Sequence, residues 1–176
     1  ILNAKDIKML LGYFKEIRLK PNEHFHAIQT VAKEVAFVEE GILRVYSVDD
    51  QGNEITKFFV REGQFAVDLD SYYPLQPSDC AYQAVKETVI YTIQKKELDR
   101  LHTEIPNLFI FLKSIAENQL LNIIKDNDFL NFGDAKTKYL EFMERYPSLA
   151  LQVPQQHIAS YLKITPQSLS RIRKEI

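Results

Sequence analysis

Residues 155–174 read QQHIASYLKITPQSLSRIRK, a stretch that predicts two short helices joined by a tight turn. Apolar residues recur where two crossing helices would share a small core, namely at Ile158, Leu162, Ile164, Leu169 and Ile172. Ala159 offers a small side chain that would let the helices approach closely. Thr165 is a good N-cap, and Pro166 suits the first helical position because its missing N–H would be unpaired there anyway. The pattern is that of a helix-turn-helix.

The second helix of this pair offers a polar and basic outer face. Its outward residues are Gln167, Ser168, Ser170, Arg171 and Lys174. Gln, Ser and Arg side chains in the first two turns are what a recognition helix uses to read the major groove of DNA. An ordinary helical hairpin with a solvated basic face fits the same spacing. Lys163 stands at the turn position often held by glycine, so any left-handed conformation there would carry an energetic cost.

Charge is distributed unevenly along the chain. Residues 134–176 carry seven basic and four acidic side chains, a net charge of +3, whereas the rest carries 15 basic and 20 acidic side chains, a net charge of −5. A basic end behind an acidic body indicates two roles, with a polyanion bound near the C-terminus.

The 176-residue chain has the composition of a folded protein, with 45% hydrophobic and 26% charged residues. No apolar run approaches the length that spans a bilayer, and no signal-peptide pattern opens the chain. The single cysteine, Cys80, excludes an internal disulfide and a cysteine-ligated iron–sulfur cluster built from one chain. These features predict a cytoplasmic protein without a membrane partner. Because the sequence starts at Ile1 and stops just after RIRKEI, we expect residues to be missing at the termini.

Short β-rich runs occupy the chain from about residue 17 to residue 93, after a predicted helix over residues 3–15. The runs read EIRLK, VAFVEE, ILRVYSV, ITKFFV, YQAV and TVIYTI, and turn signals such as PNE, DDQGNE, REGQ and PLQPSD separate them. No helix long enough for a crossover lies among them, which argues against a parallel sheet. The pattern predicts an antiparallel sandwich, roll or barrel.

A long helix is predicted from residue 107 to about residue 129, and a further helix over residues 135–145. The long helix has one apolar stripe made of Phe109, Leu112, Ala116, Leu120 and Ile123. A second stripe includes Leu108, Phe111, Ile115 and Ile124. A helix with two apolar faces needs two partners. One partner would be the β-domain of the same chain, and the other would be the same helix of a second subunit, although a monomer with a fully buried helix fits the pattern too.

The order of these parts resembles the Crp/Fnr family of bacterial transcription factors over nearly the whole length. The matching motifs are FVEEGILRVY with Gly41, DDQGNEITKFFVREGQF with Gly52 and Gly63, and IASYLKITPQSLSRIRK. DAKTKYLEFMERYPSL also resembles a branch of that family with a reduced ligand motif. The resemblance implies an α+β fold: an N-terminal antiparallel β-roll of the cyclic-nucleotide-binding jelly-roll type, a long dimerisation helix and a C-terminal winged-helix-like helix-turn-helix domain.

The resemblance also implies roles for residues of the second helix. Gln167, Ser168 and Arg171 would reach base edges, with Arg171 the best candidate for guanine. Phosphates would be bound by Lys163, Ser170, Arg173 and Lys174. The implied partners are double-stranded DNA, a second copy of the chain through the helix at about 107–130, and RNA polymerase.

The expected effector pocket departs from the family pattern. Family members that bind cyclic AMP carry a Gly–Glu pair and, about ten residues later, an Arg that pairs with the cyclic phosphate. Alignment on Gly63 places Val67–Asp68 at the first position and Ser78–Asp79 at the second. Without the arginine, a desolvated phosphate would lack a cation. The positions that touch adenine fall near Leu120 and Leu121. We therefore predict no high-affinity cyclic-nucleotide binding and either an unknown small-molecule effector or none.

Other chemistries find less support. His24 and His26 share one face of a predicted strand, as a cupin metal pair would, but the further Glu and His ligands that a cupin enzyme needs are missing. No haem setting or nucleophile–base constellation stands out, so we predict no catalytic residue, metal or cofactor. Cys80 fits a small buried hydrophobe better than a redox sensor. A dimeric ligand sensor or scaffold without DNA binding is the alternative with the same fold.

The sequence thus predicts a homodimeric regulator that binds specific DNA sites. Residues 1–103 would form the sensor domain, residues 104–133 the dimerisation helix and hinge, and residues 134–176 the DNA-binding domain, which the given sequence would leave incomplete at its C-terminal end.

Overall fold

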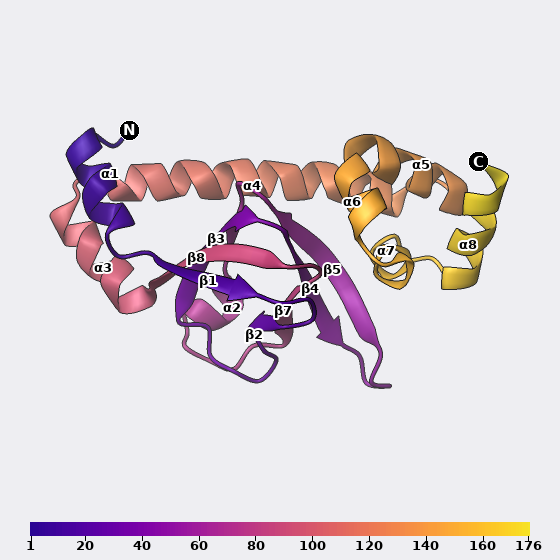
Figure 1. The fold of residues 1–176 in the computed structure, drawn as a ribbon, viewed down its shortest axis with the longest axis horizontal. Coiled ribbons are helices and arrows are strands. Elements are labelled where there is room, and N and C mark those ends of the chain that lie inside the picture. Colours follow the sequence, from indigo (N-terminus) through magenta and orange to yellow (C-terminus); the bar gives the residue numbers. More distant parts are fainter.

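The computed structural model describes residues 1–176, apart from the side chain of Asn127. A β-roll lies beneath one long helix, and a group of short helices gathers at one end of that helix (Figure 1). The N-terminal helix lies at the opposite end. The molecule therefore separates its β-rich and its C-terminal helical parts along the long helix.

The roll consists of two four-stranded antiparallel sheets. The strands are β1 (Lys15–Leu19), β2 (His24–His26), β3 (Glu34–Glu40), β4 (Ile42–Val48), β5 (Glu54–Arg61), β6 (Phe65–Ala66), β7 (Cys80–Ala84) and β8 (Thr88–Gln94). One sheet has the order β1-β8-β3-β6 and the other β2-β7-β4-β5. The antiparallel arrangement predicted from the short β-rich runs is confirmed, and it takes the roll form that the resemblance implies.

The turn between β3 and β4 requires glycine. Gly41 has a φ of +103°, and a Cβ there would lie 2.4 Å from Thr88 Oγ1 and 2.7 Å from Thr88 Cα. Both the left-handed backbone and the close approach of β8 therefore exclude a side chain. Gly52 and Gly63, the glycines of the next matching motif, also have positive φ values.

Alternation along β4 divides its side chains between two environments. Leu43 and Val45 point between the sheets into the interior of the roll, where they pack with residues such as Val38 and Ile90. The neighbours of these residues on β4 face the other way, and Ile42 packs into the C-terminal helical region instead. The second sheet therefore has two covered faces at β4.

Three helices frame the roll. They are α1 (Ala4–Leu11), α3 (Lys95–Glu104) and the long α4 (Leu108–Asn131), and a short helix, α2 (Leu69–Tyr72), lies between β6 and β7. The predicted helix over residues 3–15 is too long: α1 ends at Leu11, Gly12 follows, and β1 already begins at Lys15. Leu10, Leu101 and Leu108 join these helices in one buried cluster. No helix in the described part of the chain is long and apolar enough to cross a membrane.

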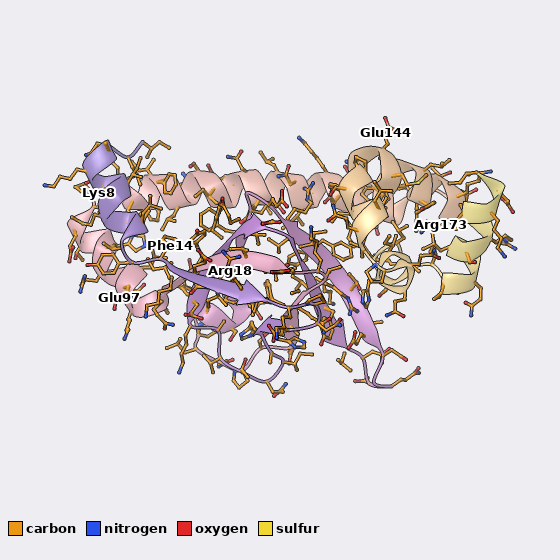
Figure 2. The ribbon with its side chains drawn as sticks, viewed as in Figure 1. Lys8, Phe14, Arg18, Glu97, Glu144 and Arg173 are labelled. Atoms are coloured by element: carbon orange, nitrogen blue, oxygen red, sulfur yellow. The ribbon has the colours of Figure 1, made fainter. Side chains whose placement is uncertain are left out.

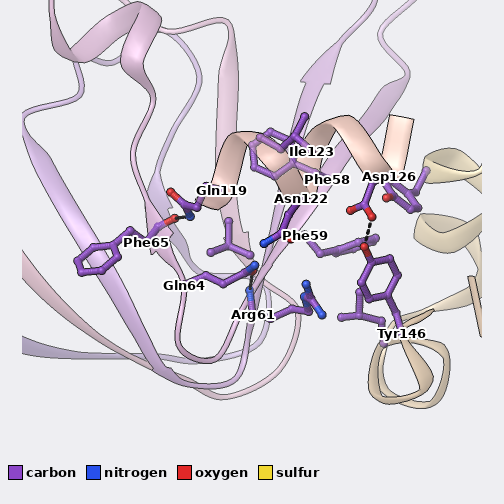
Figure 3. Close-up of a pocket in the computed structure, with 13 residues that line it drawn as sticks. Phe58, Phe59, Arg61, Gln64, Phe65, Gln119, Asn122, Ile123, Asp126 and Tyr146 are labelled. Atoms are coloured by element: carbon purple, nitrogen blue, oxygen red, sulfur yellow. Dashed lines mark hydrogen bonds between the residues drawn. The ribbon is translucent and has the colours of Figure 1, made fainter. Parts of the chain in front are cut away.

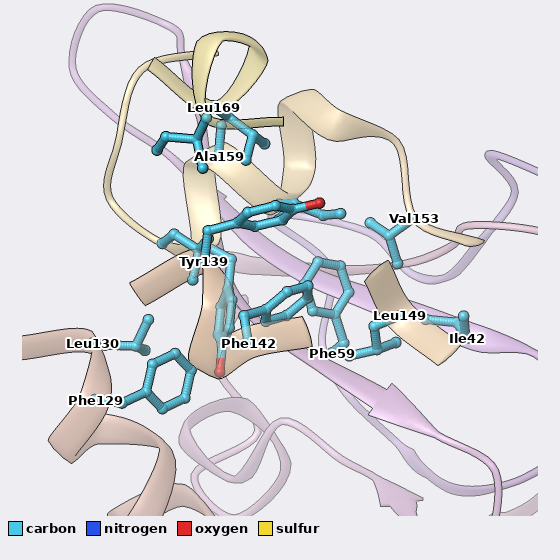
Figure 4. Close-up of a cluster of buried hydrophobic side chains, with 14 residues drawn as sticks. Ile42, Phe59, Phe129, Leu130, Tyr139, Phe142, Leu149, Val153, Ala159 and Leu169 are labelled. Atoms are coloured by element: carbon cyan, nitrogen blue, oxygen red, sulfur yellow. The ribbon is translucent and has the colours of Figure 1, made fainter. Parts of the chain in front are cut away.

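The C-terminal helices are α5 (Ala135–Arg145), α6 (Pro147–Gln152), α7 (Gln155–Tyr161) and α8 (Pro166–Glu175). Helix α6 was not predicted from the sequence, whereas α7 and α8 are the predicted helix pair. The Thr165 hydroxyl caps α8 by accepting a hydrogen bond from the Ser168 N–H at 3.1 Å, and Lys163 has a φ of +57° in the turn. Buried side chains of α4, α5, α7 and α8 form one cluster with Ile42 and Phe59 of the roll (Figure 4).

Candidate nucleic-acid interface

Helix α8 buries one face and leaves the other open. Leu169 and Ile172 are buried against the other C-terminal helices, with Ala159 of α7 fully buried at the crossing. Gln167 and Arg171 are exposed on the opposite face. The predicted division of the helix into an apolar and a polar face is thus what the structure has, and the two long polar side chains predicted to read bases are free to reach a ligand.

Ser168 is less free than its neighbours on α8. It is half-buried, and its hydroxyl oxygen accepts a hydrogen bond from the Thr165 hydroxyl at 2.9 Å. A serine hydroxyl keeps its own O–H and a second lone pair when it accepts one bond. The side chain can therefore still donate to a base, but the N-cap fixes where its oxygen lies.

The residues predicted to bind phosphates lie around the same face. Lys163, Arg173 and Lys174 are exposed, and Ser170 is half-buried. Arg173 lies on α8 at the end of the molecule far from α1 (Figure 2). Among the ion pairs of the described residues, no carboxylate partners any of these three cations or Arg171. An unpaired cluster of cations is suited to a polyanion.

The predicted effector positions of the roll, namely Val67, Asp68, Ser78 and Asp79, lie in and beside the β6–α2–β7 region and are hydrogen-bonded within the chain. The Ser78 hydroxyl, in a residue only 3% exposed, donates to Asp68 Oδ2, and the second Asp68 oxygen accepts from the Asp70 N–H at 3.2 Å. The carbonyl of Val67 accepts a hydrogen bond from the Tyr82 hydroxyl at 2.9 Å. Asp79 is exposed, and its carboxylate accepts a 3.4 Å hydrogen bond from Gln29.

Leu120 and Leu121, predicted at the adenine end of that pocket, lie elsewhere. Both are more than half exposed on α4, and neither lines the cavity of about 410 Å³ that opens in the roll. That cavity is bordered by β2, by residues 27–34 and by Asp68, Tyr82 and Gln94. Of the predicted effector residues, only Asp68 reaches it.

The histidines of β2 do not form a metal centre with other ligands. The ring Nε2 of His24 lies 3.0 Å from the Tyr46 hydroxyl, and burial lowers the pKa of His26. In the described part of the chain, no three His, Cys, Asp or Glu side chains gather as a metal site requires. Burial, and then the charge of Asp68, raises the pKa of the Cys80 thiol, which reduces the thiolate that oxidants attack.

A small cavity of about 60 Å³ marks the junction of roll, α4 and C-terminal helices (Figure 3). The Tyr146 hydroxyl donates to Asp126 of α4, and the Arg61 guanidinium of β5 lies 4.5 Å from the centre of the Tyr146 ring. Gln119 of α4 donates to the carbonyl of Phe65 at 2.8 Å. The cavity is too small for an effector, and the polar contacts in its lining join the three parts.

Sequence reasoning missed the polar residues where α7 contacts the roll. Arg44 of β4 is 1% exposed, and Ser160 of α7 bonds to the backbone of β5. One signal for Arg44 was present, because a single charge interrupts the apolar run ILRVYSV. Nothing local distinguishes Ser160 from the exposed serines of a solvated helix.

Comparison with known proteins identifies the roll. The family model for the cyclic nucleotide-binding domain matches residues 16–104, which is half of the chain. The chain belongs to the cyclic nucleotide-binding domain family. A search of curated protein sequences found no match.

Several solved structures share the fold of this chain beyond the roll. The c-di-GMP responsive global regulator CLP of Xanthomonas campestris aligns with a TM-score of 0.79 at 15% identity, over 98% of this chain and 91% of its own. FixK2 of Bradyrhizobium japonicum aligns with a TM-score of 0.74 at 18% identity, over 92% and 83%. A protein of Eubacterium rectale assigned to the Crp/Fnr family of transcriptional regulators aligns with a TM-score of 0.75 at 15% identity, over 99% and 83%.

These alignments cover the C-terminal helices as well as the roll. The predicted fold class is therefore confirmed, and the predicted family is confirmed for the cyclic nucleotide-binding domain of the roll. Within the cyclic nucleotide-binding domain of this chain, the position predicted for a phosphate-binding arginine holds Ser78, whose hydroxyl is directed at a carboxylate.

Proposed function

We propose that this chain is a homodimeric, sequence-specific DNA-binding transcriptional regulator of the Crp/Fnr type that does not respond to cyclic AMP. The observation that carries the proposal is the outer face of α8, where Gln167 and Arg171 are exposed and the surrounding cations have no carboxylate partner among the described residues. The fold is that of regulators, and a binding role explains the site better than catalysis does. Such a role would place the protein with DNA in the cytoplasm.

The proposed assembly is a dimer through α4. Large apolar side chains of this helix are more than half exposed, namely Phe109, Ile110, Leu120, Leu121, Ile123 and Ile124. Contiguous apolar surface of this kind marks an association site. A two-fold dimer would place two α8 helices for half-sites about one DNA turn, roughly 34 Å, apart. RNA polymerase would be a further partner of the bound dimer.

Paired arginine variants test the DNA contacts. Sites selected from random duplex DNA would provide the probe, and fluorescence anisotropy at several salt concentrations would provide the affinity. Arg171→Ala should weaken the preferred site by about 1–3 kcal/mol and relax the preference at one base pair per half-site. Arg173→Ala, on the same helix, should weaken all sequences alike and reduce the salt dependence by about one released ion.

Two results would contradict the proposed function. A wild-type protein that prefers no selected duplex over random polymer would favour the alternative of a dimeric sensor or scaffold. Unchanged site preference in Arg171→Ala would remove the assigned role of that side chain even if the protein binds DNA.

Charged substitutions test the dimer. Leu121→Asp with Ile124→Asp should give monomers in sedimentation equilibrium and lower DNA affinity, because each charge would be buried without a partner in the interface. Leu151→Asp is the matched control, since this α6 residue is 87% exposed but lies outside α4. If the control Leu151→Asp also gives monomers, the loss of the dimer would reflect general destabilisation and not a disrupted α4 interface.

A further inference from the structure

Helix α7 packs against the edge of the second sheet. β5 is the last strand of the order β2-β7-β4-β5, so the outer side of its backbone has no neighbouring strand. The Ser160 hydroxyl fills part of this gap: its oxygen accepts a hydrogen bond from the Thr56 N–H at 2.9 Å, and its proton points to the Glu54 carbonyl at 3.5 Å. One hydroxyl thus satisfies a donor and an acceptor of an edge strand.

A buried arginine lies beside this contact. Arg44 Nε donates to Thr56 Oγ1 at 2.9 Å, and Nη1 pairs with Glu54 Oε2 at 2.6 Å. The guanidinium also lies 4.4 Å from the centre of the Tyr46 ring. Arginine is almost never fully buried unless it is paired. Glu54 and Thr56, which bond to Ser160 through their backbone, therefore also hold the buried Arg44 guanidinium through their side chains.

His157 of α7 faces the same group. Burial, followed by the charge of Arg44, lowers the pKa of His157 to about 4, although Glu54 acts in the opposite direction. The imidazole is consequently neutral at physiological pH, and the contact holds one positive charge rather than two. The charge of Arg44 therefore meets no second cation from α7 at that pH.

Apolar packing continues the contact toward α8. The rings of Phe59 on β5 and Tyr161 on α7 have centroids 5.5 Å apart, and both belong to the cluster that contains Leu169 of α8 (Figure 4). The covalent connection from α4 to these helices passes instead through Gly133, which has a φ of +84°. Glycine leaves the backbone free to turn at this link, so the direction of α8 depends on the apolar cluster and on the contact of α7 with β5.

We propose that Ser160 is a positioning residue for the recognition helix α8, because its hydroxyl joins α7 to the edge strand β5 and so helps to set the direction of α8 relative to the roll. This inference rests on the proposed DNA-binding function and adds the element of the roll against which α7 and α8 are held.

The test uses Ser160→Ala, with Ser160→Thr to restore the hydroxyl and Ser47→Ala on β4 as the matched control. In the absence of DNA, hydrogen exchange of the Thr56 amide should become about three- to tenfold faster in Ser160→Ala, because one net hydrogen bond is lost. Spin labels at Glu87→Cys in the roll and Glu175→Cys on α8, in a Cys80→Ser background, should report a broader distance distribution. Ser160→Thr should restore both readouts.

The DNA readout uses the preferred duplex of the wild type. Ser160→Ala should bind it about three- to tenfold more weakly with an unchanged salt dependence, since no phosphate contact is removed. Unchanged exchange and an unchanged distance distribution would overturn the inference, and so would tighter DNA binding by Ser160→Ala. If the distances broaden but the wild type prefers no duplex, the positioning role stands and the proposed function fails.

Discussion

The effector region and the C-terminal helix pair treat their polar side chains in opposite ways. Around α2, Asp68, Ser78 and Tyr82 bond to one another and to the backbone, so little is left to bind a ligand. On α8, Gln167 and Arg171 extend into solvent. A shared fold therefore need not keep both the effector site and the outer face of α8 available for binding. A polar side chain can bind a ligand only where its hydrogen bonds are not already made within the chain.

Removing the core of the helix pair should have the largest effect. Leu169 is fully buried, so Leu169→Ala should lower the free energy of unfolding by about 2–5 kcal/mol through lost burial and a cavity. DNA binding should be lost with it, whereas Arg171→Ala should leave the unfolding free energy within about 0.5 kcal/mol of wild type. Urea unfolding of both variants measures this. Equal stability losses would mean that the outer face of α8 is not free.

Opening the effector region should have an intermediate effect. Asp68→Ala removes the N-cap of α2 and the acceptor for the Ser78 hydroxyl, which should destabilise the roll by about 1–2 kcal/mol. Asp68→Asn keeps an oxygen at the cap and serves as the control, with little change expected. Neither variant should alter the affinity for DNA. A loss of DNA binding in Asp68→Ala at full stability would indicate that the pocket still communicates with α8.

Low pH should weaken the contact between α7 and strand β5 of the roll. The pKa of His157 is about 4 in the folded protein and near 6.5 when unfolded, so the unfolded chain binds more protons between these values. The contribution of His157 to the free energy of unfolding is therefore fully present above pH 6.5 and is lost as the pH falls toward 4. The loss should be less than about 1.4 kcal/mol per pH unit, because the ring is only half-buried. Unfolding in urea at pH 7.5, 6 and 5 would measure the slope.

His157→Gln is the control for this pH dependence. Burial also lowers the pKa of His26, so that residue contributes to the slope in the same direction and remains in the variant. The difference between the slopes of wild type and His157→Gln isolates the contact with β5. Identical slopes would mean that His157 titrates freely in the folded protein.

Cyclic AMP should have the smallest effect of all. Ser78 offers no charge to a phosphate, and Asp68 is already bonded, so millimolar cyclic AMP should leave the unfolding temperature unchanged. A bound ligand at one hundred times its Kd would instead stabilise the fold by about 2.7 kcal/mol. A rise of several degrees in the unfolding temperature with cyclic AMP would show that the effector region, like α8, is available to a ligand.

Much of the fold could be predicted from local signals. The spacing of β-rich runs and glycine turns gave the roll, and Thr165, Pro166 and the apolar period gave α7 and α8. Local signals were weaker where several of them conflict: the helix at the N-terminus stops earlier than its apolar period suggests, at Gly12. The period of a pattern reports local geometry, and neighbouring residues can override it at the ends of an element.

The sequence by itself determined most strands of the roll, the long helix, the pair α7 and α8, the polarity of α8 and the absence of an arginine at the effector position. Tertiary structure alone decided that Ser78 bonds to Asp68, that Arg44 is buried, and that Ser160 of α7 bonds to β5 more than a hundred residues away in the chain. Helices, caps and turns depend on residues within a few positions of one another. Pairing between distant polar groups depends on how whole elements pack, and no local period records it.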